Sequence, residues 1–234
     1  MGRQGVTIGV LALQGAFAEH INILTRLKIS HLAITPLLVK TPDDLQRCDA
    51  LIIPGGESTT IALLAKLAGL LEPLKGFVKE KPVWGTCAGA ILLSEDVQGA
   101  KKGGQDLLGG INVSLERNGW GSQVESFEAP LAVHGLRDPD TPFNGVFIRA
   151  PVILELKTDP SRPPIDILAR ISPPLLPAVG SGSVSGSENG DLLDDDRTVV
   201  ALRQGRLLIT TFHPELTRDD RFHDFFVRNC VYGG

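Results

Sequence analysis

Short apolar runs recur through the N-terminal half of the chain at Val6–Leu13, Leu32–Val39, Ala50–Pro54 and Val83–Trp84. These runs are too short and too uniformly apolar for surface helices, and they are typical of strands buried on both faces of a parallel sheet. The second run contains Pro36, which cannot donate a ladder hydrogen bond and therefore predicts an edge or a bend.

Amphipathic stretches separate these runs and predict helices. The expected helices are Ala18–Leu27, Thr41–Leu45, Thr59–Leu67 and Leu71–Glu80, with a further one directly after residue 87. Strands that alternate with helices indicate an α/β protein with a mostly parallel, doubly wound sheet flanked by helices. Ligand sites in such sheets form beyond the carboxyl ends of the strands. Three glycine-marked segments fall at such ends: Gln14–Gly15, Gly55–Gly56 and Gly85–Gly89.

The pattern changes after about residue 109. Ile111–Arg117 and Val146–Arg149 indicate antiparallel strands appended to the parallel core. Val199–Arg203 and Leu207–Phe212 predict a hairpin that turns at Gln204–Gly205 and leads into His213. A closing helix is expected over Arg221–Tyr232, with three phenylalanines, Phe222, Phe225 and Phe226, facing the core.

The length of 234 residues suits one globular domain over the whole chain, 1–234. Pro177–Asp196 is rich in Ser and Gly and ends in three aspartates. This composition offers little apolar surface to bury, so a flexible surface insertion is predicted there.

Composition excludes several classes of function. The net charge of −4 gives no sign of a nucleic-acid footprint. No apolar run approaches the roughly 20 residues of a membrane span, and the N-terminal residues do not resemble a secretory leader. Three widely spaced cysteines form no metal-ligand motif and indicate reduced thiols in a cytoplasmic enzyme without metal or cofactor. We expect Cys48 and Cys230 to be structural.

Cys87 is the strongest candidate for chemistry. It lies in Gly85-Thr86-Cys87-Ala88-Gly89, between an apolar strand and an apolar helix. Flanking glycines permit a sharp turn that aims a nucleophile off the end of a sheet. The N-terminus of the following helix favours a thiolate. The sequence therefore predicts a nucleophile elbow.

A cysteine nucleophile needs a base, and His213 is the best candidate of the five histidines. It follows the last predicted strand within His213-Pro214-Glu215, so the carboxylate of Glu215 can orient the imidazole. None of the other four (His20, His31, His134 and His223) lies at a strand end beside a carboxylate. Cys87, His213 and Glu215 together predict a catalytic triad.

Pro54–Thr60 has two readings. Ser58 would cap a helix at an ordinary strand-to-helix turn. Alternatively, an N–H of Gly55 or Gly56 would join the Ala88 N–H in an oxyanion hole. Paired glycines can flip a peptide at little steric cost, so such a hole can be assembled on demand.

Several blocks, in order along nearly the whole chain, carry a family resemblance. They are Leu13–Gly15, Pro54–Thr60, Gly85–Gly89, Arg117–Gln123, Ser126–Glu128, Phe147–Pro151 and Phe212–Leu216. The chain resembles the class I (triad) glutamine amidotransferases, which have a flavodoxin-like fold, and among them the glutaminase subunits of pyridoxal 5′-phosphate synthase.

The resemblance implies hydrolysis of L-glutamine to L-glutamate and ammonia through a cysteinyl thioester. It implies a (β/α)₈-barrel synthase partner that uses the ammonia to make pyridoxal 5′-phosphate, which is the product of the complex and not a cofactor of this chain. It places six residues on glutamine: Gly56, Glu57, Ser58, Arg117, Ile148 and Arg149. It ties Gln14 to a partner-induced active state.

Two other functions remain open at this stage. The chain could serve as an amidotransferase subunit for another biosynthetic pathway, although the blocks around Arg117 and Arg149 argue against it. It could also be a regulatory scaffold of the same complex that no longer hydrolyses glutamine. The complete Cys87, His213 and Glu215 set argues against this loss of activity.

Overall fold

The computed structural model describes residues 5–99, 104–117, 119, 126–173 and 195–233. Its helices and strands, in chain order, are β1 (Gly5–Leu11), α1 (Phe17–Arg26), β2 (Ala33–Val39), α2 (Pro42–Gln46), β3 (Ala50–Ile53), α3 (Ser58–Leu67), α4 (Leu71–Glu80), β4 (Val83–Thr86), α5 (Ala88–Leu93), β5 (Ser94–Gln98), β6 (Ile111–Glu116), β7 (Ser126–Leu131), β8 (Phe143–Ile148), β9 (Val152–Leu156), β10 (Ile165–Arg170), η2 (Asp196–Thr198), β11 (Val199–Gln204), β12 (Leu207–Thr210), η3 (Pro214–Leu216), α6 (Arg221–Phe225) and η4 (Phe226–Val231). None of the helices in these ranges is long and apolar enough to cross a membrane.

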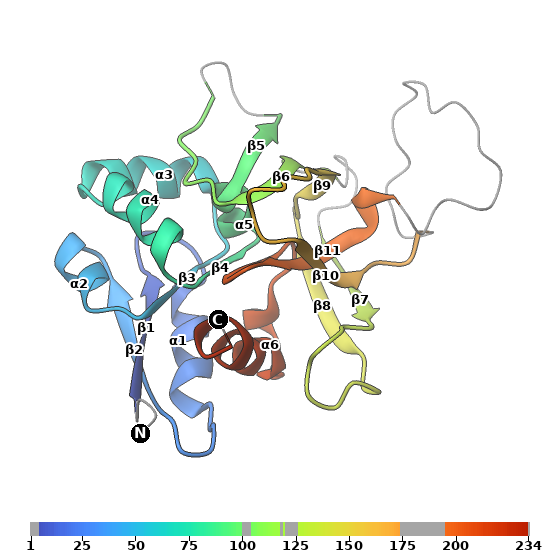
Figure 1. The fold of residues 1–234 in the computed structure, drawn as a ribbon, viewed down its shortest axis with the longest axis horizontal. Helices are drawn as coiled ribbons and strands as arrows, with labels where there is room; N and C mark the ends of the chain where they lie inside the picture. The colour runs from blue at the N-terminus through green and yellow to red at the C-terminus, as the bar shows by residue number, and fades with distance from the viewer. Residues whose placement is uncertain (1–4, 100–103, 118, 120–125, 174–194, 234) are drawn as a thin grey trace.

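A seven-stranded sheet with the order β10-β11-β12-β4-β3-β1-β2 forms the centre of the molecule (Figure 1). The strands from β12 to β2 run parallel, whereas β10 and β11 continue the sheet in antiparallel fashion. This arrangement confirms the predicted α/β class with a mostly parallel, doubly wound sheet. Strand β2 lies at the edge, as Pro36 predicted.

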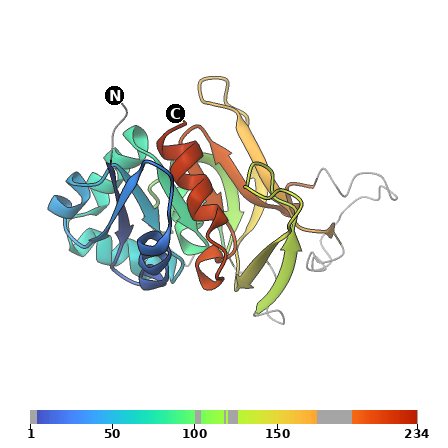
Figure 2. The same ribbon diagram turned by 90° about the horizontal axis from the view of Figure 1, so that it is seen from below.

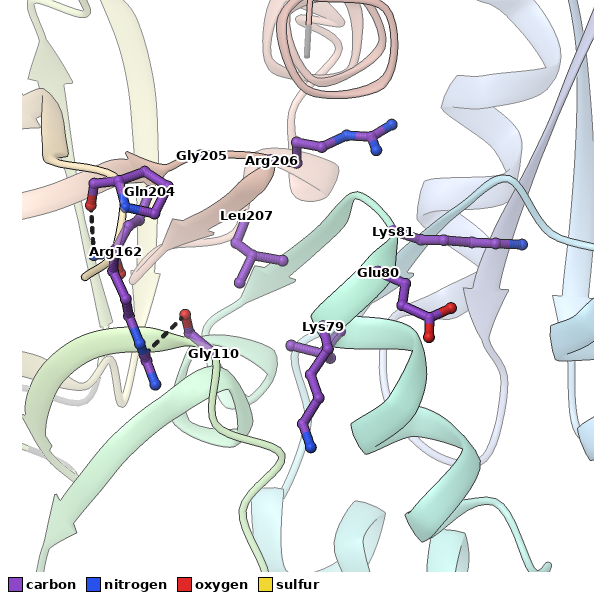
Figure 3. A pocket seen from close by; sticks show the side chains of 11 residues that line it. Lys79, Glu80, Lys81, Gly110, Arg162, Gln204, Gly205, Arg206 and Leu207 are labelled. Atoms are coloured by element: carbon purple, nitrogen blue, oxygen red, sulfur yellow. Dashed lines mark hydrogen bonds between the residues drawn. The ribbon is translucent and has the colours of Figure 1, made fainter.

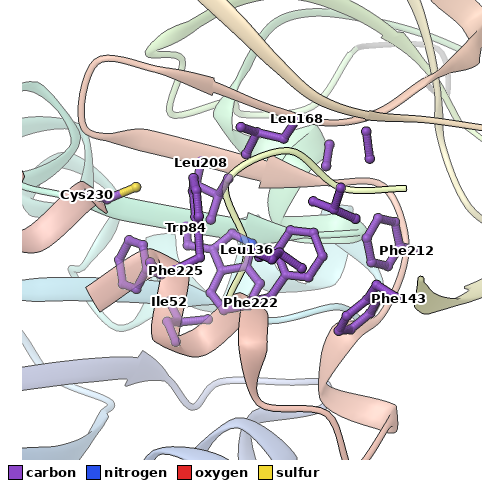
Figure 4. Packing of buried hydrophobic residues seen from close by; sticks show 14 of the residues in the cluster. Ile52, Trp84, Leu136, Phe143, Leu168, Leu208, Phe212, Phe222, Phe225 and Cys230 are labelled. Carbon is purple, nitrogen blue, oxygen red and sulfur yellow. The ribbon is translucent and has the colours of Figure 1, made fainter. Parts of the chain in front are cut away.

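Two hydrophobic cores cover the two faces of this sheet. Residues alternate along the buried strand β3: Ala50 and Ile52 face the core that packs against α1 and α6, and Leu51 and Ile53 face the core that packs against α3, α4 and α5. The first core is rich in aromatic rings (Figure 4). The rings of Phe143 and Phe222, for example, meet edge to face with centroids 4.8 Å apart.

Two small sheets extend the core. β5, β6 and β9 form one, with β6 and β9 antiparallel, and β7 and β8 form an antiparallel pair. Figure 2 shows the β7–β8 pair across the C-terminal helix from the strands of the N-terminal half. The expected antiparallel strands are therefore confirmed, but β5, which pairs with β6 in parallel, was not foreseen.

Two predicted elements differ from the expectation at their C-terminal ends. Strand β12 ends at Thr210 rather than Phe212, because the chain bends there toward the site. The closing helix is α-helical only to Phe225 and continues as a π-helix, while its three phenylalanines are buried as expected. Most of the predicted insertion lies outside the described residues. At its end, the Asp195 side chain accepts from the Arg197 N–H and the Asp196 side chain from the Leu156 N–H.

Candidate active site

Cys87 occupies the sharp turn between β4 and α5 that the sequence predicted. Its backbone adopts φ 48° and ψ −101°, a conformation in which a side chain is strained. A Cβ on Gly85 would lie 2.4 Å from the Gly89 carbonyl, and one on Gly89 would lie 2.1 Å from the Ile53 carbonyl oxygen. Both neighbours are backbone atoms, so only glycine fits at either position. The turn is thus a nucleophile elbow in geometry.

The hairpin of β11 and β12 brings His213 to this elbow. Strand β12 pairs in parallel with β4, and the Cys87 N–H donates to the Thr210 carbonyl at 2.8 Å. Three residues later, the His213 N–H donates to the Val146 carbonyl of β8, also at 2.8 Å. Pro214 then starts the short helix η3. Backbone hydrogen bonds on both sides therefore fix where the imidazole stands.

The three predicted triad residues lie together. His213 Nδ1 is 2.7 Å from Glu215 Oε1, and both Cys87 and Glu215 lie close enough to raise the pKa of His213. The Cys87 thiol reaches the Ile148 carbonyl at 3.9 Å. All three residues are buried. The order nucleophile, base, carboxylate is the one that nucleophilic catalysis requires.

Electrostatics favour charged partners in this triad. Burial opposes the charge on His213, but its contacts with Cys87 and Glu215 raise its pKa to about 10. Burial likewise opposes ionisation of Glu215, yet His20 and His213 together hold its pKa below the usual range. Near neutral pH, His213 is therefore protonated and Glu215 is ionised.

The loops after β1 and β3 interlock beside the triad. The Gly55 carbonyl accepts from the Ala16 N–H at 3.0 Å, and Gln14 Oε1 accepts from the Glu57 N–H at 2.9 Å. A Cβ on Gly55 would lie 2.3 Å from the His213 ring. Gly55, predicted to line the oxyanion hole, thus stands directly against the His213 imidazole, and Gln14 hydrogen-bonds to the same loop.

The residue that caps helix α3 differs from the one expected at an ordinary strand-to-helix turn. Glu57, and not Ser58, is the N-cap of α3, because its carboxylate accepts from the N–H groups of Thr59 and Thr60. Partial burial opposes ionisation of Glu57, but hydrogen bonds from Thr59, Thr60 and Arg117 lower its pKa to about 2.

Arg117 joins the loop after β6 to this helix cap. Its guanidinium donates to Glu57 Oε1 at 2.5 Å and to Gln105 Oε1 at 3.0 Å. Ser58 Oγ donates to the same Gln105 oxygen at 3.1 Å. Three residues expected on the substrate, Glu57, Ser58 and Arg117, therefore form one network. Gln105 completes it, and no motif in the sequence pointed to that residue.

Ile148 and Arg149, which were also predicted on the substrate, lie where β8 ends, next to the thiol. Ile148 is 40% exposed, although its carbonyl faces Cys87. Arg149 follows with φ 43°, in the left-handed region. The rest of the Arg117–Gln123 block, apart from Gly119, lies outside the described residues.

A separate cavity of 380 Å³ lies at the opposite end of the strands from Cys87, next to Lys79–Lys81 and the first residue of β12, Leu207. Figure 3 shows that the side chains of Lys81 and Arg206 extend to the right of the view and that of Lys79 downward, so the three do not converge on one point. Within the described ranges, no group of three or more metal-ligating side chains comes together. Within the part of the chain that the structure describes, Cys87, His213 and Glu215 bring a thiol, an imidazole and a carboxylate together.

Comparisons with known proteins agree with this geometry. The model of the SNO glutamine amidotransferase family matches residues 10–166 and 176–232. The "Probable pyridoxal 5'-phosphate synthase subunit PDX2" of Arabidopsis thaliana is 44% identical over 95% of this chain and 85% of its own. The "Pyridoxal 5'-phosphate synthase subunit PdxT" of Chloroflexus aggregans is also 44% identical, over 95% of this chain and 99% of its own.

A solved structure described as a glutamine amidotransferase superposes with a TM-score of 0.74 at 38% identity, covering 97% of this chain and 99% of its own. The family model covers most of the chain, and these relatives align over nearly its whole length. The chain belongs to the SNO glutamine amidotransferase family.

Proposed function

We propose that this chain is a glutaminase that hydrolyses L-glutamine to L-glutamate and ammonia through Cys87, His213 and Glu215. The observation that carries the proposal is the elbow cysteine beside a buried histidine whose Nδ1 lies 2.7 Å from a buried carboxylate. Membership in a glutamine amidotransferase family supports the choice of substrate.

The reaction follows from the roles of these groups. The Cys87 thiolate attacks the side-chain amide carbon of glutamine, and His213 gives its proton to the departing ammonia. A thioester to Cys87 remains. His213, now neutral, takes a proton from water as the water attacks the thioester, and glutamate leaves. N–H groups of Gly55 or Gly56 and of Ala88 would stabilise the oxyanion in both steps.

Glutamine would be held by its α-amino and α-carboxylate groups on either side of the thiol. Arg117 offers a forked guanidinium for the carboxylate, and Glu57 offers a carboxylate for the ammonium. In the structure these two side chains form an ion pair with each other. The glutamine zwitterion would therefore bind to groups that are already paired. Gly56, Ser58, Ile148 and Arg149 would complete the subsite through the loop after β3 and the end of β8.

The ammonia acceptor is a second subunit in this proposal. Relatives at 44% identity are named subunits of pyridoxal 5′-phosphate synthase, which implies a synthase partner for this chain in the cytoplasm. We infer a (β/α)₈-barrel partner that makes pyridoxal 5′-phosphate from the ammonia, and an activating role for Gln14, which holds the Glu57 N–H in the oxyanion loop. The whole chain would act as one amidotransferase domain.

The test is ammonia release from glutamine by the chain alone and with its synthase subunit. We expect low activity alone and a marked increase with the partner, because the Gly55–Gly56 loop can reorient. Equal rates of ammonia release with and without the synthase subunit would contradict activation by the partner. No release in either case would favour a non-catalytic scaffold.

Cys87→Ala is the matched variant for this assay. It should abolish turnover and leave binding of the synthase subunit intact, since it removes only the nucleophile. A variant that still hydrolyses glutamine would disprove the assignment of Cys87.

A further inference from the structure

We propose that His20 is a positioning residue for the triad and holds Glu215 by the carboxylate oxygen that His213 does not use. The inference rests on the proposed function, because it assigns a support to the carboxylate of the proposed triad. It also gives a role to a histidine that the sequence analysis set aside.

The unused oxygen of Glu215 is the starting observation. Oε1 contacts His213, whereas Oε2 is buried and makes no hydrogen bond of good geometry within the described residues. A buried carboxylate oxygen without a donor is costly. His20 Nε2 lies 3.5 Å from Oε2, and the side chains of both residues are 0% exposed.

His20 reaches this position from α1, and its other ring nitrogen is also engaged. Nδ1 lies 2.9 Å from His223 Nε2 in α6, and Nε2 lies 3.4 Å from Thr86 Oγ1, one residue before the elbow. The ring of Trp84 meets His20 edge to face at 5.5 Å. The imidazole is therefore fixed between β4, α6 and η3.

Only one pair of tautomers satisfies these contacts well. If His20 carries its proton on Nε2, it donates toward Glu215 Oε2, and His223 Nε2–H donates to His20 Nδ1. The opposite pair would aim a ring lone pair at the carboxylate and leave a buried N–H on His223 Nδ1, which has no partner. The first pair leaves only a bare lone pair at that atom, which costs less.

His20 acts as a neutral donor and not as a cation. Burial lowers the pKa of His20 to about 3, against the opposing effect of Glu215 and with contributions from His223 and His213. Burial also lowers the pKa of His223 to about 3, with a contribution from Arg26. The 3.5 Å contact between Nε2 and Oε2 is long for a hydrogen bond, but a buried N–H dipole still stabilises the carboxylate charge at this distance.

Two near-isosteric variants separate the roles of the two ring nitrogens. His20→Gln places an amide nitrogen about where Nε2 stands, so it keeps the donor toward Glu215. His20→Asn places its amide about where Nδ1 stands, so it keeps a group near His223 and loses the donor. Phe226→Leu is the control for packing, because Phe226 is buried beside Trp84 and its side chain has no group that can donate to Glu215.

The assay is glutaminase turnover in the complex with the synthase subunit, measured against pH. We expect His20→Asn to lower kcat about tenfold with little change in KM, and to move the acid limb of the kcat profile up by about one pH unit. The sign follows because loss of a donor to ionised Glu215 raises the pKa of that carboxyl. His20→Gln and Phe226→Leu should keep the wild-type profile.

The proposal is overturned if His20→Asn keeps the wild-type kcat and acid limb, or if the Gln, Asn and Phe226→Leu variants all lose activity alike. Nitrogen NMR of histidine-labelled wild-type chain tests it without any variant. It should show His20 as the neutral tautomer protonated on Nε2, and protonation on Nδ1 would refute the proposal. Failure of the proposed function would instead appear as absence of turnover in the wild-type complex.

Discussion

Gly89→Ala is a direct test of the elbow. Gly89 lies two residues after Cys87 in α5, where the added methyl group would lie 2.1 Å from the Ile53 carbonyl oxygen and 2.9 Å from its carbon. These are backbone atoms of the buried strand β3, so no flexible side chain can move away. We expect α5 to shift away from β3 and to carry Cys87 with it.

The magnitude follows from this overlap. A Cβ needs more than 3 Å from such an atom, so a displacement of about 1 Å is required. Overpacking of this kind costs about 1–3 kcal/mol of stability. That corresponds to roughly 2–4 °C in Tm for each kcal/mol in a chain of this size. Misplacing a catalytic group by about 1 Å costs about 100-fold in rate.

Gly76→Ala is the matched control. Gly76 lies inside α4, and a Cβ there would meet no atom within 4 Å. Alanine should stabilise that helix by about 0.5–1 kcal/mol and leave turnover unchanged. Ammonia release in the complex and thermal unfolding are measured for both variants. Full turnover by Gly89→Ala would show that the glycine is not required for the elbow, and the steric argument would fail.

Two further predictions concern the charged groups of the site. His213 has its pKa raised from 6.5 to about 10, so its charged contacts stabilise the fold below about pH 6.5, and this stabilisation is lost as the pH rises toward about 10. The Tm of the wild-type chain should fall across that window more steeply than that of His213→Gln, and parallel curves would contradict it. Arg117→Lys keeps the positive charge but loses the guanidinium that can bind a carboxylate through two N–H groups. The KM for glutamine should therefore rise about tenfold with kcat nearly unchanged. An unchanged KM would remove Arg117 from the substrate subsite.

The central fold was predictable because its signals are local. Short apolar runs of two to eight residues mark the parallel strands, and their alternation with helices determines the class. The capping box at the start of α2 was readable in the same way: Thr41 accepts from the Asp44 N–H, and Pro42 begins the helix. The elbow was visible because Gly85 and Gly89 flank one cysteine between a strand and a helix.

The elements around the central sheet were less predictable, because their conformation depends on contacts with residues far away in the sequence. Strand β5 has the sequence Ser94–Gln98, which is mostly polar and exposed, and it forms because β6 offers a free edge. Gln105 lies among glycine and lysine residues typical of a loop, yet Ser58 and Arg117 both donate to its side chain. Glu57 was expected on the substrate, but its place as the N-cap of α3 depends on a backbone angle that no motif specifies.

His20 shows the same limit within the site itself. Glu215 lies two residues from His213, so that pair is a local signal, but His20 lies in the first helix and His223 in the last, 203 positions apart. A single histidine on the apolar side of an amphipathic helix is indistinguishable in sequence from a core residue. The fold makes the difference: β12 inserts beside β4 and brings η3 against α1, so the carboxylate of the triad meets a helix that precedes the nucleophile in the chain. The parallel sheet thus assembles the site from both ends of the sequence, and the support for Glu215 becomes visible only when the two ends are in contact.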